Sequence, residues 1–331
     1  MEATDDRGLR APVSVGAALD WGRRALEVTG VPEPSWDASL LLAWALGVSR
    51  IALLTEPERP LEGDGLGRYV NAVERRAARE PLQYITGSQG FMGLEFAVDP
   101  RVLVPRPDTE VLAEAALQYL RSLPGPGPLA AADLGTGSGA LAVALAAHEP
   151  RVQVVAVDIS PDALEVARLN ARRNGVAARV TFRQGDLLEP LEGRRFAAIV
   201  CNPPYLGEEE RQGLMPEVRD YEPRLALISP GSPLRFYWRL AATARRHLEP
   251  GGLLAVEVGQ GQAGDVAELL ARAWGLRPGD GGPPAHLAAV PAHQGPVPAP
   301  GELQVRLDFG GVARVVLARL GTAGAAGRGS V

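Results

Sequence analysis

From residue 108 onwards, short apolar runs alternate with stretches of helical spacing, and this alternation constrains the fold more than any other feature. Short apolar runs bounded by turn residues are typical of buried strands, and strands that alternate with helices predict a mostly parallel sheet with helices on both faces. The predicted strands are 129–134, 152–157, 180–183, 196–201 and 253–258, and the predicted helices are 109–120, 140–147, 161–174, 233–247 and 263–273. Two further strand-like runs, 303–307 and 312–317, predict an antiparallel hairpin at the end of an α/β fold.

The preceding segment has a different character. Residues 13–80 show no strand pattern and predict a small helical bundle, in which Ser14 and Ser35 can cap the first two helices. Glycines and prolines interrupt short apolar stretches in residues 81–108, which predicts a β-hairpin linker. We therefore predict a disordered N-terminus (1–12), a helical domain (13–80), the hairpin linker (81–108), an α/β domain (109–320) and a disordered tail (321–331). A mobile proline- and glycine-rich insertion, 278–301, is expected within the α/β domain.

Composition excludes several classes of function. The 331 residues leave room for about two domains, and no apolar run reaches the roughly 18 residues of a membrane helix. All 34 basic residues are arginine, so neither a Schiff-base lysine nor a phosphate-loop lysine is available. The four histidines have no metal-ligand spacing, so we expect no metal.

Net charge and cysteine content indicate which partners and which compartment to expect. The formal net charge of −5 argues against a protein whose main partner is duplex DNA, which usually meets a basic face. The single cysteine, Cys201, permits no intrachain disulfide and fits a reducing cytoplasm. Because Cys201 lies in a predicted strand, we interpret it as a small core residue rather than a nucleophile.

A glycine-rich loop joins the first predicted strand of the α/β domain to its helix. It reads Asp133-Leu134-Gly135-Thr136-Gly137-Ser138-Gly139. Glycines at such a place let the backbone turn tightly and approach a ligand closely. The spacing differs from the Gly-x-Gly-x-x-Gly of dinucleotide-binding proteins, so the loop alone indicates either a nucleoside cofactor or a tight structural turn.

Acidic residues end the next two predicted strands. Asp158 can accept hydrogen bonds from both hydroxyls of a ribose, while Asp186 can accept from an adenine amino group and Leu187 can pack on the ring. A lone aspartate after a strand is usually a turn residue. Together with Asp133 and the glycines, however, these acids predict a positively charged adenosine compound, S-adenosylmethionine. An acid at position 133 suits the pyrophosphate of a nicotinamide cofactor poorly.

A rigid corner follows the strand 196–201. In Asn202-Pro203-Pro204-Tyr205 the prolines end regular structure, because they cannot donate backbone hydrogen bonds. The Asn202 side-chain oxygen and the Pro203 carbonyl can accept both hydrogens of a planar NH2 group, while Tyr205 covers its face. Asn-Pro and Pro-Pro also mark plain turns. The motif therefore predicts substrate binding by residues 202–205, catalysis by Asn202, Pro203 and Tyr205, and a further cofactor contact from Asn202.

These motifs, in this order, resemble those of the peptide chain release factor N5-glutamine methyltransferases (PrmC, also called HemK). The resemblance extends over nearly the whole chain from about residue 13. Its further motifs are 80–87 (Glu-Pro-Leu-Gln-Tyr-Ile-Thr-Gly), 91–94, 104–110 (Val-Pro-Arg-Pro-Asp-Thr-Glu), 221–223, Gly251-Gly252 with Glu257, and Asp308 with 314–316. The chain departs from the family at Leu187, where an aromatic residue is frequent, at 229–234 and at the insertion 278–301.

The resemblance implies a class I S-adenosylmethionine-dependent methyltransferase fold. It also implies that the substrate is the glutamine of the Gly-Gly-Gln loop of class 1 release factors, held partly by the helical domain and the hairpin. We expect a cytoplasmic monomer without a nucleic-acid substrate. Three alternatives stay open: a glutamine methyltransferase of a ribosomal protein, a DNA adenine-N6 methyltransferase, which shares the Asn-Pro-Pro-Tyr corner, and a non-catalytic adenosine-binding scaffold.

Overall fold

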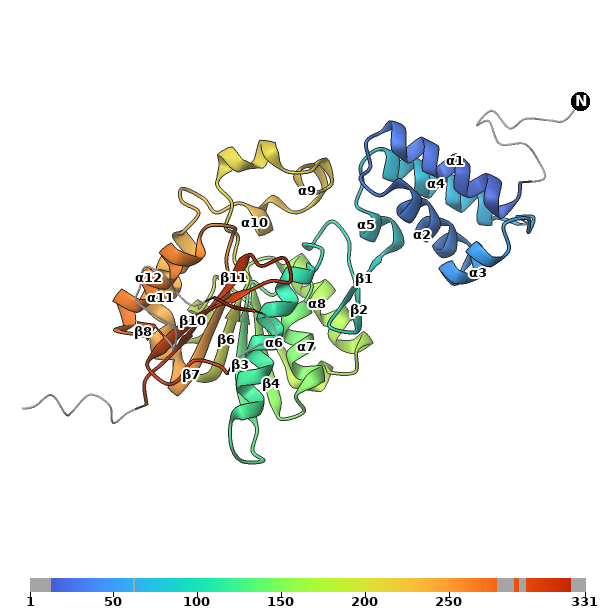
Figure 1. Ribbon diagram of the computed structural model, residues 1–331. Coiled ribbons are helices and arrows are strands. Elements are labelled where there is room, and N and C mark those ends of the chain that lie inside the picture. The colour runs from blue at the N-terminus through green and yellow to red at the C-terminus, as the bar shows by residue number, and fades with distance from the viewer. Residues whose placement is uncertain (1–12, 62, 279–288, 292–295, 323–331) are drawn as a thin grey trace, which may run out of the picture. The chain divides into compact units, whose positions relative to one another are not determined.

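The chain consists of two compact units, which are described separately. The computed structural model describes residues 13–61, 63–278, 289–291 and 296–322 (Figure 1). One unit comprises Met1–Ser88 and Leu214–Tyr221, and the other comprises Gln89–Gly213 and Glu222–Val331. The disorder predicted for residues 1–12 and for most of the tail falls outside the described residues, as does most of the predicted insertion.

The first unit is helical, as predicted. Its N-terminal part contains α1 (Val15–Val28), α2 (Pro34–Leu46), α3 (Arg50–Thr55), α4 (Gly65–Ala77) and α5 (Leu82–Thr86). The Ser14 side chain accepts a hydrogen bond from the Ala17 N–H and caps α1, which confirms that prediction. The predicted cap at Ser35 is wrong, because Pro34 already occupies the first turn of α2, where a missing N–H has no consequence.

A later segment of the chain completes this unit. Helix α9 (Pro216–Tyr221) carries Glu217, whose carboxylate accepts hydrogen bonds from Arg76 at 2.8 Å and from Arg79 at 2.7 and 2.8 Å. The Tyr221 hydroxyl donates to the Ala78 carbonyl at 2.7 Å. The chain therefore passes between the two units three times, which the sequence analysis did not predict.

The segment 81–108 is only partly a hairpin. Helix α5 occupies its beginning, and the run 102–104 forms no strand. The hairpin itself consists of β1 (Ser88–Phe91) and β2 (Leu94–Ala97). Met92 and Gly93 join the two strands with φ of 51° and 72°, the left-handed conformation that a tight two-residue hairpin turn requires at both positions.

The second unit is built on a sheet of nine strands within the described residues. The strands are β3 (Leu129–Leu134), β4 (Val152–Asp158), β5 (Val180–Gln184), β6 (Phe196–Cys201), β7 (Leu248–Glu257), β8 (Arg277–Pro278), β9 (Ala289–Pro291), β10 (Glu302–Leu307) and β11 (Ala313–Arg319). Their order is β5-β4-β3-β6-β7-β11-β10-β8, with β9 also paired to β10. Strands β3 to β7 are parallel, and β11 is antiparallel to both β7 and β10. The predicted mostly parallel sheet with a C-terminal antiparallel hairpin is confirmed.

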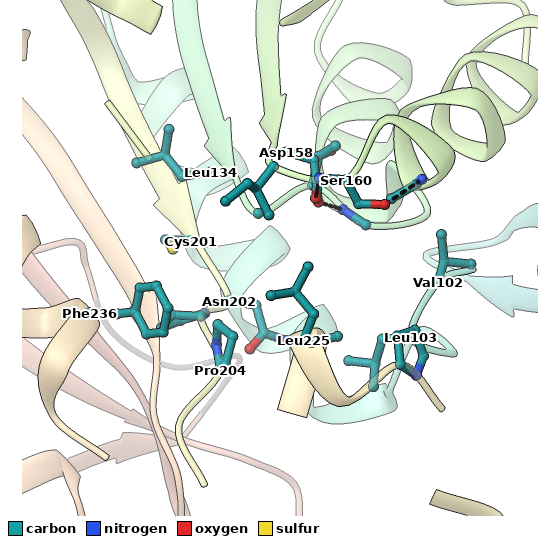
Figure 2. A pocket seen from close by; sticks show the side chains of 18 of the residues that line it. Val102, Leu103, Leu134, Asp158, Ser160, Cys201, Asn202, Pro204, Leu225 and Phe236 are labelled. Carbon is teal, nitrogen blue, oxygen red and sulfur yellow. Dashed lines mark hydrogen bonds between the residues drawn. The ribbon is translucent and has the colours of Figure 1, made fainter. Parts of the chain in front are cut away.

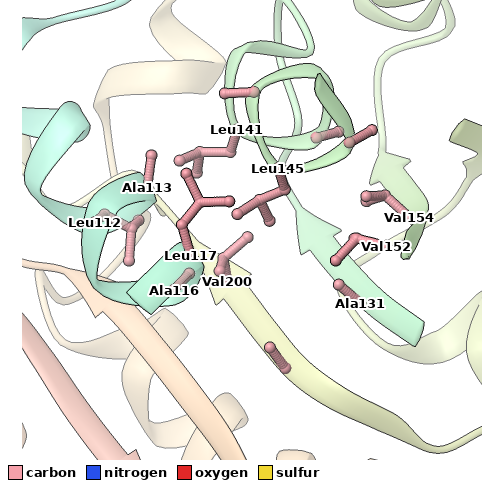
Figure 3. Packing of buried hydrophobic residues seen from close by; sticks show 14 of the residues in the cluster. Leu112, Ala113, Ala116, Leu117, Ala131, Leu141, Leu145, Val152, Val154 and Val200 are labelled. Atoms are coloured by element: carbon pink, nitrogen blue, oxygen red, sulfur yellow. The ribbon is translucent and has the colours of Figure 1, made fainter. Parts of the chain in front are cut away.

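Helices cover both faces of the sheet (Figure 1). One face packs against α6 (Pro107–Ser122), α7 (Ala140–His148) and α8 (Pro161–Arg173), and the other against α11 (Arg235–Thr243) and α12 (Ala263–Trp274). Neighbouring strand residues alternate between the faces, so Ala131 packs in one core and Ala132 in the other. Figure 3 shows the first of these cores, in which leucines of α6 and α7 meet Val154 and Val200 of the sheet.

Shorter helical segments connect these elements. They are α10 (Arg224–Leu227) and the 3-10 turns η1 (Ala177–Arg179), η2 (Glu189–Leu191), η3 (Glu208–Gly213) and η4 (Ala244–His247). Strand β9 lies inside the segment that was expected to be an irregular insertion, and it pairs with β10 in parallel. In the part of the chain that the structure describes, no helix has both the length and the apolar character needed to cross a bilayer.

Candidate active site

A cavity of about 320 Å³ opens at the carboxyl ends of the parallel strands (Figure 2). Its position follows from the strand order: the chain runs from β3 outwards to β4 and β5, and then returns to the other side of β3 as β6. Open parallel sheets bind ligands at such a switch point, where the loops after neighbouring strands diverge. The volume lies at the lower end of the range for small-ligand sites, roughly 300–1,000 Å³.

The glycine-rich loop forms one wall of this cavity. Gly135, Thr136, Gly137 and Ser138 line it, whereas Gly139 does not. Gly139 precedes α7 with φ of 82°, and a Cβ atom there would lie 3.1 Å from the Ala167 Cβ of α8. Gly139 therefore allows the close approach of the two helices behind the loop, rather than contact with a ligand.

Asp133 lies beneath the loop and does not line the cavity, so its position gives no support to the predicted contact with the cofactor. Its side chain is fully buried, and Oδ2 accepts hydrogen bonds from the Thr136 hydroxyl at 2.6 Å and the Ala142 N–H at 3.0 Å. Burial raises the pKa of Asp133 to about 7, although these two hydrogen bonds oppose the shift. The acid holds the loop to the start of α7.

Asp158 lines the cavity at the end of β4. Its Oδ2 accepts from the Gly137 N–H at 2.8 Å and its Oδ1 from the Ser160 N–H at 2.9 Å (Figure 2). A carboxylate has about four acceptor sites, so the Asp158 side chain retains capacity to accept from a ribose beside these backbone donors. Burial raises the pKa of Asp158 despite these backbone hydrogen bonds. Ser160 caps α8, because its side chain accepts a hydrogen bond from the Ala163 N–H.

The end of β5 carries a partner that the sequence analysis missed. Asp186 and Leu187 both line the cavity, and Asp186 Oδ1 accepts from Arg239 Nη1 of α11 at 2.9 Å. Leu187 has φ of 51°, a conformation that is strained for a leucine and that recurs at binding sites. Arg239 comes from an element 53 positions away, and no local pattern marks it.

The corner after β6 divides between the cavity and the core. Asn202, Pro203 and Pro204 line the cavity, and the Asn202 side chain extends into it in Figure 2. Asn202 Nδ2 donates to the Thr109 hydroxyl oxygen at 3.2 Å. Tyr205 is half-buried against the core on the α11 and α12 side and does not line the cavity. The stacking of Tyr205 on a substrate amide therefore stays a prediction.

The segment after the corner supplies another wall. Pro223, Leu225, Ala226 and Ile228 line the cavity, and none of these was predicted as a site residue. Backbone hydrogen bonds join the two ends of this segment: the Leu206 N–H donates to the Leu227 carbonyl, and the Ser229 N–H donates to the Leu206 carbonyl.

A buried acid holds the same segment in place. Glu222 is 6% exposed and accepts from Arg106 Nη2 at 2.6 Å. Burial raises the pKa of Glu222, and Arg106 opposes that shift. Both residues belong to motifs of the resemblance, which gave the sequence signal but no role.

Comparison with known proteins agrees with this geometry. The family described as the PrmC N-terminal domain matches residues 17–87, and the methyltransferase small domain matches residues 114–217. The parallel sheet, the glycine-rich loop and the cavity define a class I S-adenosylmethionine-dependent methyltransferase.

Curated relatives cover most of the chain. A release factor glutamine methyltransferase from Geobacter sulfurreducens is 45% identical over 78% of this chain and 89% of its own length. One from Moorella thermoacetica is 48% identical over the same shares, and one from Koribacter versatilis is 44% identical over 78% and 90%. The chain belongs to the release factor glutamine methyltransferase family.

Proposed function

We propose that this protein transfers a methyl group from S-adenosylmethionine to the side-chain amide nitrogen of a glutamine, in the Gly-Gly-Gln motif of class 1 peptide chain release factors. The observation that carries the proposal is the position of Asn202. It lies at the cavity wall, and its amide nitrogen is occupied in a hydrogen bond to the Thr109 hydroxyl oxygen. The side-chain oxygen is therefore left to accept a hydrogen bond from a substrate.

The residues around the cavity fit the cofactor. Asp158 offers two carboxylate oxygens at the wall, as a ribose requires, and the backbone of residues 135–138 gives close access beside it. Asp186 keeps its Oδ2 for an adenine amino group while Oδ1 is held by Arg239. When bound, S-adenosylmethionine supplies an electrophilic methyl group on a sulfonium centre.

The protein's own contribution is positioning. An amide nitrogen is a poor nucleophile, because its lone pair is delocalised into the carbonyl. The Asn202 oxygen and the Pro203 carbonyl would accept its two N–H groups and fix the plane of the amide in the cavity. Holding two reactants in a productive geometry can supply roughly 7–11 kcal/mol of the barrier. No base is required in this scheme, since the proton can leave the nitrogen after methylation.

The helical unit and the hairpin would hold the release factor. We propose that the enzyme acts as a monomer and that it has no nucleic-acid substrate. Light scattering gives the molar mass of the free enzyme and of its complex with a release factor, and so tests whether the enzyme is a monomer. A cytoplasmic location remains a prediction from the single cysteine.

Transfer of a tritiated methyl group tests the main proposal. We expect labelling of a class 1 release factor and none of the same factor with its Gly-Gly-Gln glutamine changed to alanine. Asn202→Ala should still bind the cofactor in calorimetry but lose transfer, since the nitrogen is no longer aimed. Near-normal transfer by Asn202→Ala would contradict the mechanism.

The same assay separates the alternatives. Labelling of a ribosomal protein or of DNA, but not of the release factor, would show that the substrate is not the one proposed. DNA must be included because DNA adenine methyltransferases share the Asn-Pro-Pro-Tyr corner. Absence of S-adenosylmethionine binding in calorimetry would favour a scaffold.

A further inference from the structure

A buried carboxylate stands beside Asn202 and has no role in the function proposed so far. Glu257 ends β7, and the backbone pair of Cys201 with Val256 places Glu257 level with Asn202 on the neighbouring strand. Its side chain is 2% exposed, and among the described residues its Oε2 atom has no hydrogen-bond partner. Burying an acid in this way is costly, so its presence calls for a reason.

Hydrogen-bond donors, not a dedicated cation, face this carboxylate. Side-chain hydrogen bonding from Thr109 and from Asn202 lowers the pKa of Glu257. Arg314 attracts it, but the guanidinium is already paired with Asp308 at 3.0 Å and with Asp108 at 3.2 Å. The pKa of Glu257 is raised to about 7, mainly by burial and also by the charge of Asp108, while Thr109, Arg314 and Asn202 oppose the shift.

The other titratable neighbours do not alter this picture. Tyr237 donates its hydroxyl to the backbone carbonyl of Glu257 at 2.9 Å, and not to its carboxylate. Tyr205 and Cys201 interact electrostatically with Glu257. Burial raises the pKa of both groups, so they stay neutral near pH 7.

The directions of these hydrogen bonds are coupled. The Thr109 oxygen accepts from Asn202 Nδ2, which leaves the single Thr109 hydroxyl hydrogen to donate to Glu257. An ionised carboxylate only accepts, so it favours the Asn202 orientation in which the NH2 group points towards Thr109 and Glu257. The flipped amide has almost the same shape but would direct its oxygen at the carboxylate, which is repulsive.

We propose that Glu257 is a positioning residue whose negative charge, together with Thr109, keeps the Asn202 side-chain oxygen turned towards the cavity. The inference rests on the proposed function for its effect on methyl transfer, but not for the effect on Asn202 itself. A neutral Glu257 can donate a hydrogen bond to Asn202 and so permits the flip. The flipped Asn202 would present an NH2 group to the NH2 group of the substrate amide and would not hold it.

The first test reads Asn202 directly, without substrate or cofactor. The chain has only four asparagines, at positions 71, 170, 174 and 202. Selective nitrogen-15 labelling of asparagine therefore gives few side-chain signals, and Asn202→Ala assigns the one of interest. We expect the Asn202 side-chain resonances to shift with a midpoint near pH 7 in the wild-type protein and to stay constant in Glu257→Gln. Asn202 side-chain resonances that are the same at pH 8 in the wild type and in Glu257→Gln would overturn the proposal.

The second test reads transfer. Because a glutamine can also donate to Asn202, we expect Glu257→Gln to lower kcat about ten- to hundredfold at pH 8, the range for losing a hydrogen bond to a charged group. The KM for S-adenosylmethionine should change less than about twofold, and kcat should rise from pH 6 to pH 8 in the wild type only. Glu149→Gln, which removes another buried carboxylate paired with Arg151 far from the site in sequence, is the control and should keep the wild-type profile.

Stability separates positioning from a structural role. The raised pKa means that the folded state resists ionisation of Glu257, so the free energy of unfolding falls as pH rises from the ordinary glutamate range through about 7. Glu257→Gln removes that cost, and we expect it to unfold at the same or a higher temperature than the wild type at pH 8. A variant that keeps wild-type kcat, or that loses activity only in proportion to lost folded protein, would refute the role. Absence of wild-type transfer to a release factor would instead refute the proposed function and leave the resonance test to decide on Glu257.

Discussion

Glu217 and Arg76 are 141 positions apart in the sequence, yet Glu217 Oε1 accepts a hydrogen bond from Arg76 Nη2 at 2.8 Å. Arg76 also donates to Asp37 at 2.7 Å, so the arginine lies between two acids inside the helical unit. The pairing fastens α9 to this unit. The residues that follow α9 belong to the other unit, and several of them, within 223–228, line the cofactor cavity. One continuous stretch of chain therefore contributes to both units.

Glu217→Gln should loosen α9 from the helical unit. Removing one partner of a buried ion pair leaves uncompensated charge and typically costs about 3 kcal/mol. We expect a loss of that order in the free energy of unfolding measured with urea. Glu208→Gln is the matched control, because the Glu208–Arg224 pair is more than half exposed and such pairs contribute about 1 kcal/mol or less. Equal effects of the two substitutions would contradict the assigned role of Glu217.

The same pair should make the helical unit sensitive to acid. Burial by itself would raise the pKa of Glu217, but hydrogen bonds from Arg79 and Arg76 outweigh it and lower the pKa below the ordinary value. A lowered pKa gives stability that is complete above the ordinary glutamate range and is lost as pH falls through the folded-state value. The difference in unfolding free energy between wild type and Glu217→Gln should therefore shrink on going from pH 7 to pH 3. A difference that grows would show the opposite shift.

Asp158→Asn should weaken cofactor binding. An asparagine has one acceptor oxygen, so it cannot accept from both Gly137 and Ser160 and still receive two ribose hydroxyls. We expect the Kd for S-adenosylmethionine in calorimetry to rise at least about tenfold, as when a hydrogen bond to a charged group is lost. Asp162→Asn, on the exposed first turn of α8, should bind normally. Unchanged binding by Asp158→Asn would remove Asp158 from the cofactor site.

Gly139→Ala should damage the loop although Gly139 does not touch the cavity. The backbone there has φ of 82°, which costs about 1 kcal/mol or more for alanine, and the new Cβ would press on Ala167 at 3.1 Å. We expect a lower melting temperature together with weaker cofactor binding. Gly175→Ala has a similar φ of 72° but open space around its Cβ, so it isolates the backbone cost from the packing cost. If the two variants melt alike, close packing between α7 and α8 is not what requires Gly139.

The architecture of the second unit could be predicted because its signals are local. Strands β3 and β6 coincide with the predicted ranges 129–134 and 196–201. Strand β3 is apolar apart from Asp133 and is followed by Gly135, and β6 is apolar throughout and is followed by Asn202-Pro203. Strands buried on both faces are apolar throughout, which makes them easy to find. The hairpin was predicted within residues 81–108, but its two-residue turn at Met92 and Gly93 was not, because residues 91–98 were predicted as one apolar stretch.

The placement of candidate site residues at the cavity was predictable only where they end or follow a strand. Parallel strands bring their carboxyl ends to one edge, so Asp158, Asp186 and Asn202 meet at the cavity as expected. The side-chain directions were not predictable: Asp133 points beneath the loop, and Tyr205 lies against the core. Which face a residue after a strand presents depends on the path of the following loop, and that path is set by packing.

The sequence by itself determined the order of strands and helices along the chain, the glycine-rich loop and the corner at Asn202. It could do so because hydrophobic periodicity, helix capping and proline act within a few residues. Tertiary structure alone decided the pairings of Glu217 with Arg76, Asp186 with Arg239 and Glu222 with Arg106. It also decided the burial of Glu257 beside Asn202. Each of these depends on bringing together segments that are distant in the chain, and the energy of a charge depends on how much water the surrounding fold removes.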